Sequence, residues 1–69
     1  MGQEQFEISV PAADYDAMPG LAEEAMQDVV RRRCAMHGYK VVRTWVDREK
    51  HPEHGQVVVR RFIGEPING

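Results

Sequence analysis

Two short pairs of cysteine and histidine residues are the part of this sequence whose types and spacing could do chemistry. They are "CAMH", with Cys34 and His37, and "HPEH", with His51 and His54. Read together they give C-x2-H-x13-H-x2-H, which is close to zinc-finger spacing, and thiolate and imidazole are ligands that zinc prefers. The pattern therefore raises the hypothesis of a zinc site.

The elements that carry the two pairs argue against that hypothesis. Cys34 and His37 end a predicted helix, and His51 and His54 lie in the loop after the strand that follows. That strand would hold the pairs about 25–30 Å apart at about 3.3 Å per residue. We therefore expect no metal site within one chain, and leave open a site shared between subunits. The simpler interpretation is a partly buried thiol, a histidine at a helix end and two solvated loop histidines.

Nucleophilic catalysis has one candidate, Cys34 with His37 as its base. A catalytic cysteine favours a helix N-terminus, where the dipole lowers its pKa, whereas Cys34 lies near the opposite end. No glycine-rich phosphate loop is present, since Gly20, Gly38 and Gly55 fall at predicted helix ends and a hairpin. We expect no enzymatic activity and no cofactor.

Length and charge narrow the class of protein further. The 69 residues predict one domain, 1–69, with an ordered core over about 5–64 and a tail over 65–69. The single cysteine and the absence of a long apolar run predict a cytoplasmic chain without membrane contact. The net charge of −2 offers no basic excess for nucleic acid. A chain this short buries only about 60% of its unfolded surface, which favours self-association as a supplement.

Hydrophobic periodicity predicts an α+β fold of the order β-α-β-β, with one helix packed on a three-stranded, mainly antiparallel sheet. In the first strand, Phe6, Ile8 and Val10 alternate with polar residues, which predicts one buried face. The segment before the helix is turn-like. The predicted ranges are strand 5–11, helix 19–37, strand 39–47, hairpin loop 48–55 and strand 56–63.

The stretch "VVRTWV" at 41–46 poses the question of which face meets the core. Pairing Asp47 with Gln56 sets Arg43 against Arg60, and a slip of one residue sets Arg43 against Arg61. Like charges directly opposite each other destabilise a ladder, and burying them beneath a helix is costly. We therefore expect the arginine-bearing face to point outward and to form the partner or oligomer interface. Its residues are Tyr39, Val41, Arg43, Trp45, Arg60 and Phe62. The alternative is that Trp45 packs under a loop or the C-terminal tail.

This surface predicts a small non-enzymatic interaction or assembly module. Self-association, with a dimer as the first expectation, is the simplest use of such a surface, and another protein partner is the second. The alternative function is a nucleic-acid-binding regulator that stacks bases on Trp45 and Phe62 beside Arg43 and Arg60. The acidic net charge weakens that alternative.

In its order of elements and its size, the chain resembles the dodecins, with Trp45 on the second strand as the residue that matches in role. The resemblance spans the chain loosely and is topological. It implies assembly into a closed shell and, as a third hypothesis, binding of a flavin or another small ligand beside Trp45. The Arg43 and Arg60 pair, the charged hairpin and the arginine run depart from that family's pattern, which puts flavin binding in doubt.

Overall fold

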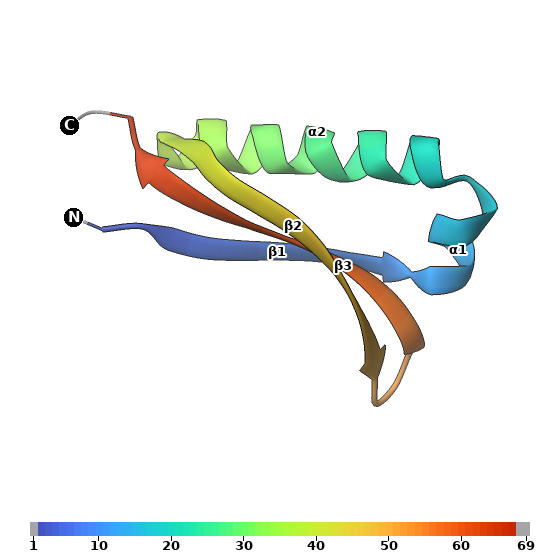
Figure 1. Ribbon diagram of the computed structural model, residues 1–69. Helices are drawn as coiled ribbons and strands as arrows, with labels where there is room; N and C mark the ends of the chain where they lie inside the picture. Colours follow the sequence, from blue (N-terminus) through green and yellow to red (C-terminus); the bar gives the residue numbers. More distant parts are fainter. Residues whose placement is uncertain (1, 68–69) are drawn as a thin grey trace.

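The computed structural model describes residues 2–67 and confirms the α+β class. Three antiparallel strands form one open sheet in the order β1-β3-β2, with α2 along one side of it and α1 at the end of β1 (Figure 1). Among these residues, no helix is long and apolar enough to cross a membrane. The elements are β1 (Glu4–Pro11), α1 (Ala12–Ala17), α2 (Pro19–His37), β2 (Tyr39–His51) and β3 (Gly55–Pro66).

Helix α2 has the predicted bounds, and a residue typical of a helix terminus lies at each end. Pro19 lies at the start, and Gly38 follows the last turn with a φ of 71°. The Gly38 N–H donates to the carbonyls of Ala35 and Cys34, which completes a left-handed cap that glycine adopts without strain. The segment predicted as a turn before α2 is the short helix α1, consistent with three alanines in its six residues.

The core lies between α2 and the sheet in two adjacent clusters. One cluster is Ala12, Met26 and Val58, and the other is Val30, Cys34 and Phe62. The alternating residues of β1 pack against these clusters, as predicted from their period of two. The residues concerned are Phe6, Ile8 and Val10.

The β2–β3 hairpin has a different register from the one that we expected. β2 continues to His51, which pairs with Gly55, so that the loop shrinks to residues 52–54. Gly55 has a φ of 72°, the left-handed conformation that closes such short loops. Asp47 therefore faces Val59 rather than Gln56. The longer strands move the pairing by an odd number of residues, which turns every β3 side chain to the opposite face.

This register corrects the predicted interface on β3. Phe62 is 1% exposed in the core beneath α2, and Arg60 lies on the same side of the sheet. Neither belongs to the outward face. No arginine opposes an arginine along the described ladder, because Arg60 pairs with Val46 and Arg61 with Trp45.

A β-bulge corrects the prediction for the start of β2. The register shifts between Val41 and Arg43, so Val42 interrupts the alternation. Val41 then pairs with Gly64 on the helix side, and Tyr39 packs against the Phe62 cluster. Of the six residues expected on the outward face, only Arg43 and Trp45 lie there. β3 also continues to Pro66, so Glu65 and Pro66 belong to the sheet, whereas residues 68 and 69 of the expected tail lie outside the described residues.

Candidate functional site

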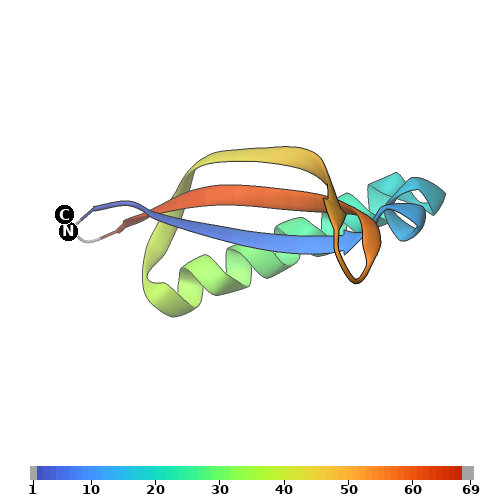
Figure 2. The ribbon, with the colours of Figure 1, turned by 90° about the horizontal axis from the view of Figure 1, so that it is seen from below.

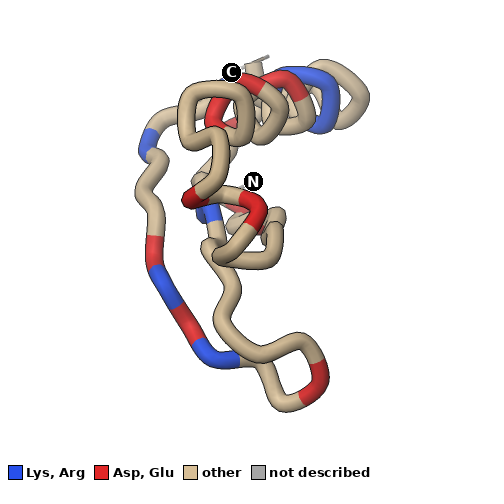
Figure 3. The backbone as a smooth tube through the Cα atoms, turned by 90° about the vertical axis from the view of Figure 1, so that its right-hand side faces the viewer, with Lys and Arg blue, Asp and Glu red and all other residues tan. Residues whose placement is uncertain are grey.

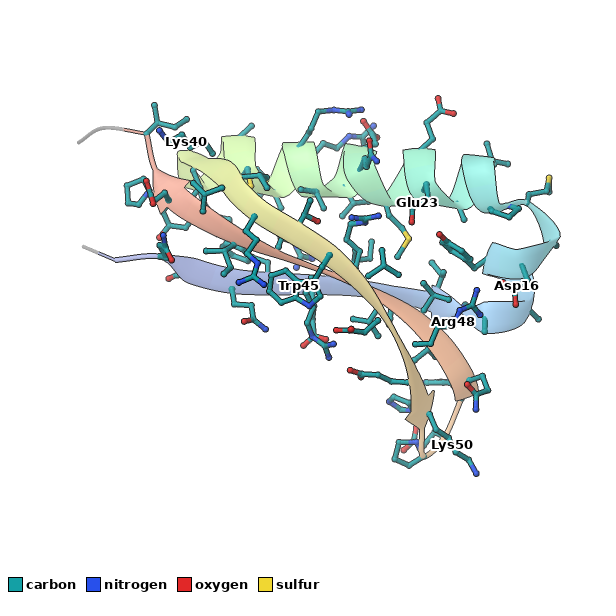
Figure 4. All side chains as sticks on the ribbon, in the orientation of Figure 1. Asp16, Glu23, Lys40, Trp45, Arg48 and Lys50 are labelled. Atoms are coloured by element: carbon teal, nitrogen blue, oxygen red, sulfur yellow. The ribbon has the colours of Figure 1, made fainter. Side chains whose placement is uncertain are left out.

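The sheet face turned away from α2, here called the open face, carries Trp45 (Figure 4). Alternation along the paired strands places the members of this face on one side of the sheet. They are mostly charged or β-branched. The open face comprises Gln5, Glu7 and Ser9 of β1, Arg43, Trp45, Asp47 and Glu49 of β2, and Val57, Val59, Arg61 and Ile63 of β3.

Trp45 is held between a cation and an anion of its own strand. The Arg43 guanidinium carbon lies 5.0 Å from the centre of the indole ring, within the range of a cation–π contact. The indole Nε1–H donates to the Asp47 carboxylate at 3.1 Å. Trp45 is half-buried and Arg43 is exposed. Within residues 2–67, Arg43 forms no ion pair with a carboxylate.

Arg61 is the centre of an acidic cluster on the open face. Its guanidinium lies 2.6 Å from a Glu49 oxygen, 2.9 Å from an Asp47 oxygen and 3.4 Å from a Glu7 oxygen. Three carboxylates surround one cation, which leaves the cluster with a net charge of −2. Hydrogen bonds to Glu49 and Asp47 raise the pKa of Arg61, and the bond from Arg61 lowers the pKa of Glu49.

These ion pairs predict that acid weakens the fold. The pKa of Glu49 lies below its ordinary 4.5 because of Arg61, and that of Asp16 lies below 3.8 because of Arg48. A carboxyl whose pKa is lower in the folded state stabilises that state fully above its unfolded pKa and loses this contribution as the pH falls through the folded pKa. Urea unfolding should therefore give a constant free energy from about pH 6 to 5 and a declining one below about pH 4.5.

Glu49→Gln provides the matched control for the acid sensitivity. The variant keeps the size of the side chain and removes its titration, so its free energy of unfolding should decline less steeply between pH 4.5 and 3. An unchanged slope in this variant, or a constant wild-type stability down to pH 3, would contradict the assigned ion pairs.

A second polar network joins the two helices to the other side of the sheet. Arg60 of β3 donates to the Glu23 carboxylate of α2 and, at 3.0 Å, to the Thr44 hydroxyl. The Tyr15 hydroxyl of α1 donates to the same carboxylate at 2.8 Å. Figure 4 shows Glu23 pointing from α2 toward the sheet. Arg60 is only 12% exposed, and its Nε–H has no hydrogen-bond partner within residues 2–67.

This network explains how an arginine lies beneath the helix, which the sequence argument excluded. Glu23 lies near the start of α2, where a carboxylate also interacts well with the helix dipole. Its partner Arg60 is 37 residues away, so local spacing offered no signal for the pair. Arg48 and Asp16 form a further pair at 2.7 Å, which joins β2 to α1 (Figure 4).

Within the sheet, the exposed large apolar side chains lie on β2 rather than at the centre of the open face. Val57 and Val59, on the open face of β3, are only 7% and 2% exposed. Val41, Val42 and Val46 are 39%, 43% and 37% exposed. Figure 2 shows β2 along one border of the sheet, with the middle of α2 displaced toward β1. β2 therefore offers both the aromatic–cation stack and the uncovered valines.

The cysteine and histidine pairs do not come together. Cys34 is buried in the core, which raises the pKa of its thiol, and His37 stacks on Phe6 and Tyr39. His51 Nδ1 accepts hydrogen bonds from two backbone N–H groups of the hairpin loop. The loop and the end of α2 lie at opposite ends of the molecule (Figure 1). Within residues 2–67, no group of three or more His, Cys, Asp or Glu residues is placed to hold a metal ion.

No protein-family model, curated protein or solved structure matches the chain. The resemblance to the dodecins therefore rests on the order of the elements and the position of Trp45.

Proposed function

We propose that this chain is a non-enzymatic assembly module that binds a second copy of itself through the β2 side of its open face. The observation that carries the proposal is that positive and negative charges are separated along β2. Arg43 is free of ion pairs with the described carboxylates, whereas Asp47 and Glu49 belong to a cluster with two excess negative charges. A two-fold axis near Trp45 brings the cationic end of one copy to the acidic end of the other.

The composition of this surface suits protein contact. Tryptophan and arginine are enriched where binding energy concentrates, and Trp45 is preorganised by Arg43 and Asp47. Val41, Val42 and Val46 supply further apolar area on the same strand, Val41 and Val46 on the side of the sheet opposite the stack. The core of a chain of 69 residues is small, so covering these side chains stabilises the protein as well as the assembly.

Nucleic acid is the less favoured partner for the same surface. The carboxylates of Glu7, Asp47 and Glu49 lie beside Trp45 and Arg61, and they would repel a phosphate backbone. Phe62, the second ring expected to stack on bases, lies in the core. At low salt, single-stranded DNA should leave the tryptophan fluorescence unchanged. Saturable quenching that disappears at high salt would favour nucleic acid instead.

Trp45→Ala should weaken self-association at least about tenfold in Kd while leaving the helix content unchanged. A central tryptophan in an interface typically contributes 2 kcal/mol or more, and about 1.4 kcal/mol corresponds to tenfold. Sedimentation at 1–100 µM would measure the mass, and circular dichroism the fold.

Met36→Ala is the matched control for the tryptophan substitution. Met36 is 82% exposed on α2, so its removal takes away apolar surface without touching β2. The mass of this variant should equal that of the wild type. A wild-type monomer at 100 µM, or a Trp45→Ala variant with unchanged mass, would contradict the proposal.

A further inference from the structure

The outer edge of β2 is a long strand edge without a partner in the described chain. β2 has 13 residues and pairs only with β3, so the backbone N–H and C=O groups of its other edge point away from the sheet. Such an edge is a template for another strand. The bulge at Val42 leaves regular pairing from Arg43 to His51. In Figure 2, β2 lies along one border of the sheet, and the middle of α2 is displaced toward β1 on the other.

We propose that β2 pairs antiparallel with β2 of a second copy, around a two-fold axis through Val46, to form one continuous six-stranded sheet. The inference rests on the proposed self-association and specifies its geometry. Two residues that face each other across the new strand pair then have numbers that add up to 92. Because the sum is even, both open faces lie on the same side of the joined sheet, and both α2 helices lie on the other.

This register turns the charges of β2 into complementary pairs. Arg43 faces Glu49 of the second copy, and the two-fold axis repeats this pair on the other side of Val46. Trp45 faces Asp47 of the second copy, next to the Asp47 of its own chain that accepts its indole N–H. Opposite charges across an antiparallel ladder stabilise it, and here the pair occurs twice. Figure 3 shows the alternating charges along β2 toward the hairpin.

Neighbouring registers are less favourable. A two-fold axis at Trp45 pairs Arg43 with Asp47, but it leaves only residues 43–47 in regular pairing beyond the bulge. An axis at Asp47 places this carboxylate against its own copy, which destabilises the ladder. With the axis at Val46, the segment 43–49 pairs with itself, and it begins directly after the bulge. The length of the regular segment and the charges on it therefore favour one register.

The exposure of Val46, on the side of the sheet that carries α2, also favours a two-fold axis through this residue. Val46 is 37% exposed although its neighbours on β3 are covered by α2. Pairing at Val46 sets the two copies of this residue against each other, and each covers the other. Contact of this kind between β-branched side chains is favourable in antiparallel pairs.

Val46→Cys tests the axis directly. Opposed Cα atoms in an antiparallel pair lie about 4.5–5.5 Å apart, within the range that a disulfide spans. Mild oxidation should convert most of this variant to a covalent dimer. The wild type, whose Cys34 is buried, should stay uncrosslinked. Thr44→Cys is the matched control, because its copies would lie about 13 Å apart, four residue steps along the ladder.

Charge exchange tests the register. Arg43→Glu and Glu49→Arg, each alone, should raise the dimer Kd at least about tenfold, since each creates two like-charge pairs. A mixture of the two variants should form a heterodimer of near wild-type affinity, because both pairs are then opposite in sign. Lys50→Glu is the control with the same charge change, since Lys50 would face Val42, and its Kd should change less than about threefold. Thermal melts would establish that Glu49→Arg stays folded beside Arg61.

The outcomes separate the inference from the proposed function. A wild-type dimer in which Val46→Cys does not cross-link, or a mixture that stays monomeric, would overturn the edge pairing while leaving self-association in place. Face-to-face packing of the open faces gives that result, because Val46 lies on the other side of the sheet. A wild-type monomer at 100 µM would overturn both.

Discussion

Phe62→Ala should remove a large part of the free energy of unfolding at 25 °C. Phe62 is 1% exposed, packs with Val30 and Cys34, and lies with its ring centre 5.3 Å from that of Phe6. Removing such a ring costs about 3–5 kcal/mol. At about 0.05–0.15 kcal/mol per residue, a chain of this length has about 3–10 kcal/mol in total. Circular dichroism with urea titration would measure the loss.

Ile63→Ala is the neighbouring control for this prediction. Ile63 is half-buried on the open face, so truncation there should cost about 1 kcal/mol and leave the fold intact. Equal losses at the two positions would mean that Phe62 lies outside the core, as in the register first expected from the sequence. Comparing the two variants therefore tests which face of the sheet each of these β3 side chains occupies, independently of any partner.

Glu23→Ala should lower the free energy of unfolding by about 2–3 kcal/mol. The substitution leaves the guanidinium of Arg60, which is only 12% exposed, without its anion, and it removes the acceptor of the Tyr15 hydroxyl. Losing one partner of a buried ion pair costs about 3–5 kcal/mol, and the 24% exposure of the Glu23 side chain brings the expected loss to the bottom of this range or just below it. Urea unfolding at pH 7 would measure the change.

A second substitution separates the effect of losing the ion pair from the effect of losing a residue that favours the helix. Glu24→Ala removes a carboxylate from the same helical turn, on the exposed side, and should change stability by less than about 0.5 kcal/mol. Arg60→Met in the Glu23→Ala background removes the uncompensated cation and should recover part of the loss. If Glu23→Ala and Glu24→Ala are equally stable, the Glu23–Arg60 pair does not hold α2 to the sheet.

Several features of the fold were predictable because their causes are local. The alternation of Phe6, Ile8 and Val10 with polar residues indicated the buried face of β1. Pro19 and Gly38 indicated the ends of α2, since each has a backbone preference that needs no distant partner. The outward position of Trp45 was also predicted correctly, although the argument relied on an arginine pair that does not form.

The sequence could not predict which face of the sheet each β3 side chain occupies, because this depends on where the hairpin closes. Extending both strands into the charged segment buries Phe62 and moves Arg60 beneath α2, where Glu23 neutralises it. The bulge at Val42 then moves Val41 and Tyr39 away from Arg43. A strand's period is two, so a single residue more or less in a loop or bulge reverses every assignment beyond it.

The sequence by itself determined the α+β class, the helix bounds and the buried side of β1, because these follow from periodicity and from the conformations of proline and glycine. Only the tertiary structure decided which arginine lies beneath α2, which is surrounded by carboxylates and which, on β2, forms no ion pair within residues 2–67. Those three environments depend on the placement of other strands and helices, with partners up to 54 residues away along the chain. They form together only when register, bulge and helix position are fixed.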